Sequence, residues 1–153
     1  MPFPRILFLD IDGVLNHAGS VPIGDGFVVE PDIAQRLNEI TTMTGAGIVI
    51  TSLWRRQFAV PELQQILRRA GVIGEVVGVT PDLRASHGYG VERGWEIGHW
   101  LQEHFPDGGV TFAILDDNPI GPLSRYLVPV SFSTGLADAQ VTEVVRRLKS
   151  PTG

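Results

Sequence analysis

The chain has 153 residues, 43% of them hydrophobic and 19% charged, with no cysteine and a formal net charge of −5. This length fits one domain, and the lack of cysteine excludes disulfides, zinc–thiolate sites and a thiol nucleophile. The acidic balance argues against non-specific nucleic-acid binding over the whole surface, although a local arginine patch is compatible with it. No apolar run is long enough to span a bilayer, so we expect a cytoplasmic protein without membrane contact.

The hydrophobic pattern alternates between short apolar runs, which are typical of buried strands, and apolar residues at helical spacing. It predicts five strands, over residues 5–11, 48–50, 72–79, 110–115 and 126–132. Helices are predicted between them and after the last strand, from apolar residues at helical spacing: Ile33, Leu37 and Ile40 in the first, Leu63, Ile66, Leu67 and Ala70 after Pro61 in the second, Ile97, Trp100, Leu101 and Phe105 in the third, and Val141, Val144, Val145 and Leu148 in the last. This alternation predicts an α/β fold, with a five-stranded parallel sheet, right-handed crossovers and helices on both faces.

Polar residues follow three of the predicted strands where each strand stops. They are Asp10, Asp12 and Gly13 after the first, Thr51 and Ser52 after the second, and Asp116, Asp117 and Asn118 after the fourth. Ligands of parallel α/β sheets bind at the carboxyl ends of the strands. We therefore expect four carboxylates and two hydroxyls to converge at one edge of the sheet.

The spacing of the acids favours a divalent cation. Asp10 and Asp12 lie two residues apart, so on a strand both side chains point to the same side, where two carboxylates repel each other unless a cation lies between them. Oxygen ligands without imidazole or thiolate favour Mg²⁺. The string Asp-x-Asp-Gly also suits an ordinary turn. However, acids placed in and directly after buried apolar runs are costly unless paired, and a second Asp pair favours a functional site.

Three segments carry a family resemblance. Residues 8–15 (FLDIDGVL), 48–52 (IVITS) and 113–117 (AILDD) resemble the first, second and fourth motifs of the haloacid dehalogenase (HAD) superfamily, in the same order. The strings 51–55 (TSLWR) and 115–118 (LDDN), with Gly135 and Leu136, resemble the compact HAD-domain group associated with bacterial RNA-repair proteins. The resemblance implies a Rossmann-like HAD fold without a large cap domain. It also implies a Mg²⁺-dependent phosphomonoesterase that works through an aspartyl-phosphate.

The resemblance implies roles for individual residues. Asp10 is expected to be the nucleophile, and Asp12 the acid that protonates the leaving group and then activates water. Thr51 is expected to bind a phosphate oxygen, with Ser52 as the alternative. The expected metal ligands are Asp10, the backbone carbonyl of Asp12, and Asp116 or Asp117, with Asp117 slightly favoured. Gly13, Ser52, Arg55 and Asn118 are the expected substrate-binding residues.

The chain departs from the superfamily at one position. A lysine normally precedes the fourth strand, where it neutralises the phosphate and the nucleophile, but the only lysine here is Lys149. Arg93, at the start of the preceding helix, is the expected substitute, and Arg84 is the second candidate. Arginine keeps the charge with a different geometry. The alternative is that Arg93 is a solvated surface residue.

The segments between the motifs suit one domain over 1–153, with a small flap at about 19–29, a hairpin around Asp25 and Gly26, and a substrate loop at about 80–92. An uncapped site suits a bulky substrate such as a nucleic-acid end. A small phosphate ester, with the site closed by a partner subunit of an oligomer, is the alternative. Trp54 could stack on a base or pack in the core, whereas Trp95 and Trp100 are expected in the core.

Two further function classes stay open at the level of sequence. The missing lysine is compatible with a catalytically weak HAD-like binding or regulatory domain. Transfer of the phosphoryl group to an acceptor other than water is disfavoured because an uncapped site lets water compete.

Overall fold

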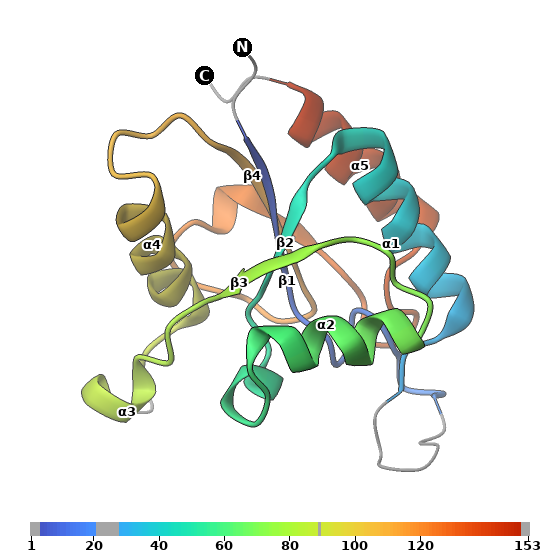
Figure 1. Cartoon of the computed structure of the whole chain (residues 1–153), viewed down its shortest axis with the longest axis horizontal. Helices are drawn as coiled ribbons and strands as arrows, with labels where there is room; N and C mark the ends of the chain where they lie inside the picture. The colour runs from blue at the N-terminus through green and yellow to red at the C-terminus, as the bar shows by residue number, and fades with distance from the viewer. Residues whose placement is uncertain (1–3, 21–27, 89, 151–153) are drawn as a thin grey trace.

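The computed structural model describes residues 4–20, 28–88 and 90–150 of the chain. Five parallel strands form one sheet in the order β3-β2-β1-β4-β5, and helices lie on both of its faces (Figure 1). The elements run β1 (Arg5–Leu9), α1 (Pro31–Thr44), β2 (Gly47–Ile50), η1 (Leu53–Arg56), α2 (Val60–Arg69), β3 (Val76–Val79), α3 (Arg84–His87), α4 (Arg93–His104), β4 (Thr111–Asp116), η2 (Ser124–Tyr126), β5 (Leu127–Pro129) and α5 (Asp138–Lys149).

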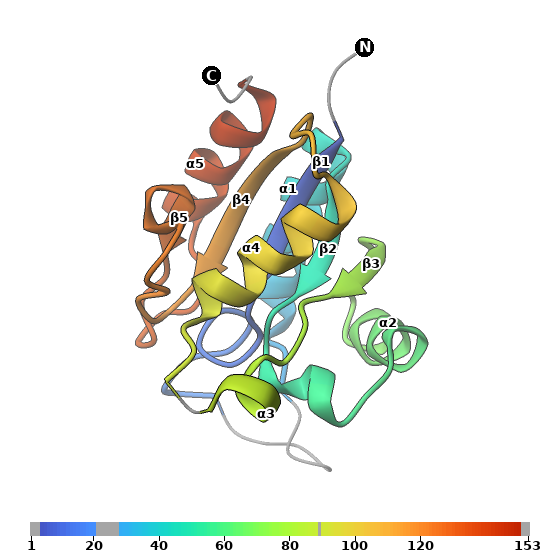
Figure 2. The same cartoon turned by 90° about the vertical axis from the view of Figure 1, so that its left-hand side faces the viewer.

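The two faces of the sheet have separate cores because neighbouring residues of β1 point to opposite sides. Leu7 and Leu9 pack in the larger core, to which α1, α2 and α5 contribute. Ile6 and Phe8 pack in the smaller core, which α4 covers from the other face (Figure 2). The predicted Rossmann-like α/β fold is therefore confirmed, and no cap domain occurs among the residues that the structure describes.

Several strands are shorter than predicted. The first strand ends at Leu9 instead of residue 11, and the third begins at Val76 instead of residue 72. Before Val76 the chain turns at Gly71, whose φ is 97°, and the backbone N–H of Val72 donates to the carbonyl of Leu67 at 2.9 Å. Val72 is buried in the core without being in the sheet, which explains why its hydropathy resembled that of a strand.

The fifth strand is also shorter than the predicted 126–132, since β5 ends at Pro129. A 3-10 turn, η2, closes at Tyr126, and a turn with the Gly135 N–H on the carbonyl of Ser131 follows the strand. The pattern did not predict the short helices η1, α3 and η2. The predicted flap falls largely on residues 21–27, outside the described residues, and α3 lies inside the predicted loop at 80–92.

Helix α4 presents one face to the sheet. Ile97 and Trp100 are buried in the smaller core, as expected. Trp95 is instead 57% exposed, so its assignment to the core was wrong. It lies five residues before Trp100, a spacing that places the two side chains on different sides of a helix. Trp95 faces outward, as does the exposed His99. Within the described ranges, none of the helices is both long and apolar enough to cross a membrane.

The start of α4 is fixed against the chain that follows β4. The backbone N–H of Gly94 donates to the carbonyl of Ile120 at 2.8 Å, and a Cβ at position 94 would overlap the carbonyl oxygen of Pro122. A glycine at this position therefore lets α4 lie close to the strand end that carries Asp116.

We predict that Gly94→Ala lowers the free energy of unfolding by about 1–3 kcal/mol, because backbone atoms must move to admit the methyl group. The matched control is Gly98→Ala in the same helix, where a Cβ meets no atom within 4 Å. This control should gain about 0.5–1 kcal/mol from the better helix propensity of alanine. Urea unfolding measures both, and equal effects of the two substitutions would contradict the assigned contact.

Candidate active site

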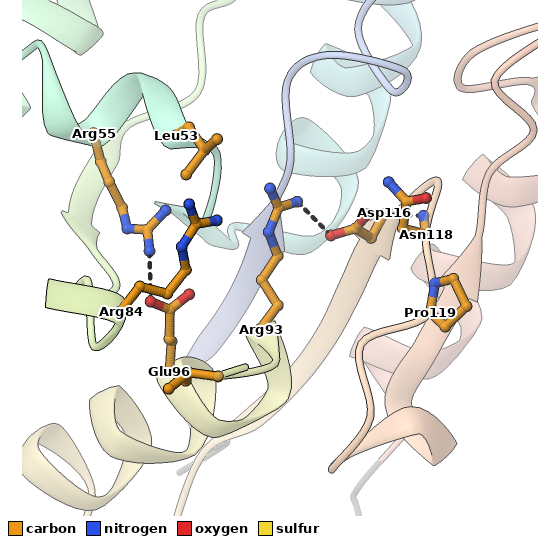
Figure 3. A pocket seen from close by; sticks show the side chains of 9 residues that line it. Leu53, Arg55, Arg84, Arg93, Glu96, Asp116, Asn118 and Pro119 are labelled. Carbon is orange, nitrogen blue, oxygen red and sulfur yellow. Dashed lines mark hydrogen bonds and ion pairs between the residues drawn. The ribbon is translucent and has the colours of Figure 1, made fainter. Parts of the chain in front are cut away.

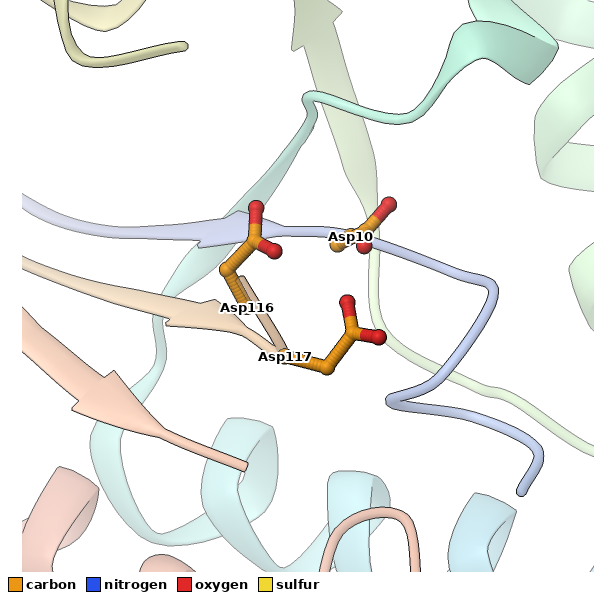
Figure 4. Close-up of side chains that lie close together, drawn as sticks. All are labelled: Asp10, Asp116 and Asp117. Atoms are coloured by element: carbon orange, nitrogen blue, oxygen red, sulfur yellow. The ribbon is translucent and has the colours of Figure 1, made fainter. Parts of the chain in front are cut away.

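Three carboxylates meet where β1 and β4 end. These strands are neighbours, and Leu9 is paired with Leu115, so the residues that follow them lie side by side. Asp10, Asp116 and Asp117 each offer a carboxylate oxygen, and these oxygens lie within 4.8 Å of one another (Figure 4). The predicted convergence of the first and fourth strand ends is thus present in the structure.

Arg93 holds two of these carboxylates together. Its Nη1 lies 3.0 Å from an oxygen of Asp10. The same atom lies 2.7 Å from an oxygen of Asp116 (Figure 3). Burial disfavours the arginine cation, but attraction to the two carboxylates outweighs it and raises the pKa of Arg93. The first residue of α4 therefore supplies the positive charge at the point where two strand ends would otherwise repel each other. Arg93 is not a solvated surface residue.

Burial dominates the electrostatics of the acids. It raises the pKa of Asp10 from 3.8 to about 7, against the opposing charge of Arg93, and the nearby Asp116 adds to the increase. Burial likewise raises the pKa of Asp116, while Arg93 and the backbone N–H of Asn118 act in the opposite direction. Asp10 is only 4% exposed. A buried carboxylate with a pKa near neutrality is typical of a functional site.

Asp117 differs from Asp116 in how it is held. Both oxygens of Asp116 have strong donors, Arg93 on one and the backbone N–H of Asn118 on the other at 2.9 Å. Asp117 accepts a longer hydrogen bond of 3.3 Å from the side chain of Asn118. Gly13 gives Asp117 its space: it has a φ of 85°, and a Cβ there would clash with the Asp117 carboxylate.

Asp12 lies outside this cluster. Because β1 ends at Leu9, the alternation of a strand does not extend to Asp12, and its side chain is exposed. Its two oxygens accept from the indole Nε1 of Trp54 at 3.0 Å and from Nδ2 of Asn16 at 3.1 Å. Trp54 is mostly buried and so belongs to the core while its ring nitrogen orients Asp12.

The second strand end distinguishes Thr51 from Ser52. The hydroxyl of Ser52 accepts the backbone N–H of Trp54 at 3.2 Å and caps η1. The Thr51 hydroxyl is buried and makes no hydrogen bond within the described residues. A buried hydroxyl without a partner is costly unless a ligand satisfies it. Of the two hydroxyls, the one of Thr51 therefore has its hydrogen-bonding capacity left for a bound group.

Arg55 forms a buried ion pair with Glu96. Its Nη2 lies 2.9 Å from Glu96, and each side chain is 3% exposed. The guanidinium also donates to backbone carbonyls, the shortest at 2.6 Å to Thr51 and 2.9 Å to Thr80. Burial lowers the pKa of Arg55, against the charge of Glu96. Through these contacts, Arg55 joins the segment after β2 to α4. Its donors are largely engaged within the protein, which does not favour the predicted contact with substrate.

A pocket of about 180 Å³ opens beside these groups. Its lining comprises Leu53, Arg55, Arg84, Val91, Arg93, Glu96, Asp116, Asn118 and Pro119. Arg84 therefore lies at the pocket, and Arg93 contacts both Asp10 and Asp116. Asn118 is exposed at the rim, and Arg56 pairs with Asp82 at 2.7 Å.

A family model confirms the resemblance seen in the motifs. The model described as the HAD domain in Swiss Army Knife RNA repair proteins matches residues 6–141. The chain belongs to this HAD-domain family. A search of the curated proteins found no match. Membership places the chain among hydrolase-type HAD domains, and the match spans all three strand ends described above.

The sequence analysis did not identify one buried acid beside the pocket, Glu96. Glu96 holds Arg55 and also accepts the backbone N–H of Leu83 at 2.9 Å, so it connects three segments around the pocket. A signal was available: Glu96 directly precedes Ile97 and lies four residues before Trp100, on the face of α4 that packs on the sheet. An acid on such a face requires a buried partner.

We predict that Glu96→Gln lowers the free energy of unfolding by about 3 kcal/mol, since it leaves the buried Arg55 cation without its carboxylate. Glu103→Gln, on the exposed side of the same helix, should change it by less than about 0.5 kcal/mol. Urea unfolding at neutral pH measures the difference. A loss no larger at position 96 than at position 103 would show that the pair contributes nothing.

Proposed function

We propose that this HAD domain is a Mg²⁺-dependent phosphomonoesterase that works through an aspartyl-phosphate on Asp10. The observation that carries the proposal is the buried Asp10 carboxylate, held at the end of β1 between Arg93 and the acids that follow β4. A carboxylate in this position has a cation beside it, and that cation, Arg93, lines the pocket together with Asp116. Family membership supports the hydrolase class.

The donor set fits a hard divalent cation. Asp10, Asp116 and Asp117 offer only oxygen, which Mg²⁺ prefers, and the backbone carbonyl of Asp12 is expected to supply a further oxygen ligand. Between the paired acids we favour Asp117, because Arg93 and Asn118 already engage both oxygens of Asp116. When bound, the cation supplies positive charge that lowers the repulsion between a carboxylate and a phosphate dianion.

The remaining steps use side chains of the domain. A carboxylate oxygen of Asp10 attacks phosphorus and forms the acyl phosphate, while the ester oxygen leaves. Asp12 gives that oxygen a proton and then takes one from the water that hydrolyses the intermediate. Trp54 and Asn16 orient Asp12 for both transfers. Thr51 donates its hydroxyl, which is otherwise unpaired among the described residues, to a phosphate oxygen, and Arg93 stabilises the developing charge.

The open site supports phosphates at nucleotide or nucleic-acid ends as substrates, and the description of the family points to an RNA-repair setting. Small-metabolite phosphates are the second possibility. Turnover that falls steeply with salt favours a nucleic-acid substrate, because binding to a phosphate tract releases counterions.

A different function has one observation in its favour. Two carboxylates already satisfy Arg93, which would leave less of its charge for a phosphate. That geometry suits a catalytically weak binding or regulatory domain. Turnover of any simple phosphate ester that depends on Asp10 excludes this alternative.

We predict that the wild-type protein releases phosphate from simple esters with Mg²⁺ and not with excess EDTA. Asp10→Asn should lower turnover at least about a thousandfold, since it removes the nucleophile. Asp107→Asn, at an exposed turn, is the matched control and should retain full activity. A colorimetric phosphate assay across a panel of esters measures this. Turnover that survives Asp10→Asn would refute the aspartyl-phosphate route.

We predict that Arg93→Ala lowers turnover by about a hundredfold, because it removes the cation beside the nucleophile. Arg68→Ala, on the exposed side of α2, should have no effect, and Arg93→Lys should restore part of the loss. Steady-state kinetics with the best ester of the panel give kcat for each variant. Equal kcat for the Arg93→Ala and Arg68→Ala variants would remove Arg93 from the site.

A further inference from the structure

A second pocket lies beside the candidate active site. It has a volume of about 420 Å³ and is lined by Leu83, His87, Gly90, Val91, Trp95 and His99. Val91 lines both pockets, and the adjacent residues Leu83 and Arg84 line one each. The second pocket therefore adjoins the first, and its lining residues come from α3, from the segment that follows it and from the first turns of α4.

Helix α4 contributes to both pockets from one short stretch. Its first residue, Arg93, contacts the nucleophile and Asp116, while Trp95 and His99 line the second pocket. Trp95 and His99 lie four residues apart and so project from the same face of the helix. Arg93 therefore lies between the shared wall residue Val91 and Trp95 in the chain, so the start of α4 borders both the carboxylate cluster and the second pocket.

The lining suits a flat ring. Trp95 exposes 57% of its surface, an unusually open position for a large aromatic residue that buries well. Leu83 and Val91 provide apolar walls, and His87 and His99 provide two further rings with hydrogen-bonding nitrogens. Aromatic side chains stack on planar rings, and an indole is the largest such surface a protein has.

The lining also excludes other ligands. None of its six residues is an arginine, a lysine or a carboxylic acid, so it has no fixed charge with which to bind a second phosphate or a cation. The volume falls within the range of pockets that hold small organic groups. A neutral planar ring that is joined to a phosphate matches both the chemistry and the position.

We propose that this second pocket binds the nucleobase of a nucleotide whose phosphate lies at Asp10. This inference rests on the proposed function and narrows its substrate to phosphomonoesters of nucleotides. The nucleotide is either free or the terminal unit of a nucleic acid, since both present a base next to a phosphate. Trp95 stacks on the base, and Arg93 and Trp95 together set the distance between the two recognised groups.

The kinetic test compares adenosine monophosphate with ribose phosphate, which lacks the base. We expect the ratio of their kcat/KM values to favour the nucleotide in the wild type and to fall about tenfold in Trp95→Ala. Trp95→Phe should keep part of the preference, because phenylalanine still stacks. Ile73→Ala is the control, an apolar residue that is 64% exposed and does not line either pocket. It should leave the ratio unchanged.

A terminally phosphorylated short oligonucleotide distinguishes the two sources of the base. A Trp95 effect with this substrate assigns the pocket to a nucleic-acid end, and an effect with adenosine monophosphate alone assigns it to a free nucleotide; either result supports the proposal. A ratio that does not change in Trp95→Ala with either substrate overturns it.

A binding experiment separates this inference from the proposed function. Adenosine, which carries no phosphate, should shift the indole N–H signal of Trp95 in the nitrogen–proton spectrum, with that signal assigned by its loss in Trp95→Phe. Ribose alone should leave it in place. If the wild type turns over no ester, the proposed function fails, and this spectrum still decides on the pocket. Absence of a shift at millimolar adenosine overturns the inference.

Discussion

The candidate site of this HAD domain depends on how the repulsion between acids at the ends of neighbouring strands is offset. The pairing of β1 with β4 brings Asp10 and Asp116 together in the interior, where each ionised carboxylate is costly. Arg93 offsets that cost by contacting both at once. The offset is incomplete, since burial raises the pKa of Asp10 to about 7 even with the Arg93 guanidinium beside it.

The position of Arg93 depends on contacts elsewhere in α4. Gly94 lets the start of the helix lie against the chain after β4, and Glu96 ties the next part of the helix to Arg55 in the loop after β2. The helix is therefore fixed at its first turn to the segments that follow two different strands. A guanidinium that is supplied by a helix needs such fixing, because a small tilt of the helix would move it away from Asp10.

Much of this arrangement follows from the sequence. Buried strands read as apolar runs, and parallel topology brings their carboxyl ends to one edge, so the convergence of Asp10, Thr51 and Asp116 could be predicted. The lengths of the strands could not be predicted. Val72, for example, is buried by tertiary packing outside the sheet, and its hydropathy does not distinguish this position from one in a strand. The direction of Asp12 depends on where β1 ends, and the partner of Arg55 lies 41 positions away in an acid that helical periodicity alone does not pair with it.

The ion pairs of Arg93 affect how the folded domain balances the charge of its clustered acids. Because a guanidinium belonging to the chain itself already balances the clustered acids, the polypeptide carries its own counter-charge from the moment it folds. Arg93 thereby lowers the repulsion between Asp10 and Asp116 without requiring a divalent ion between them. Under the proposed function, loss of the metal ion would stop turnover and leave the polypeptide folded.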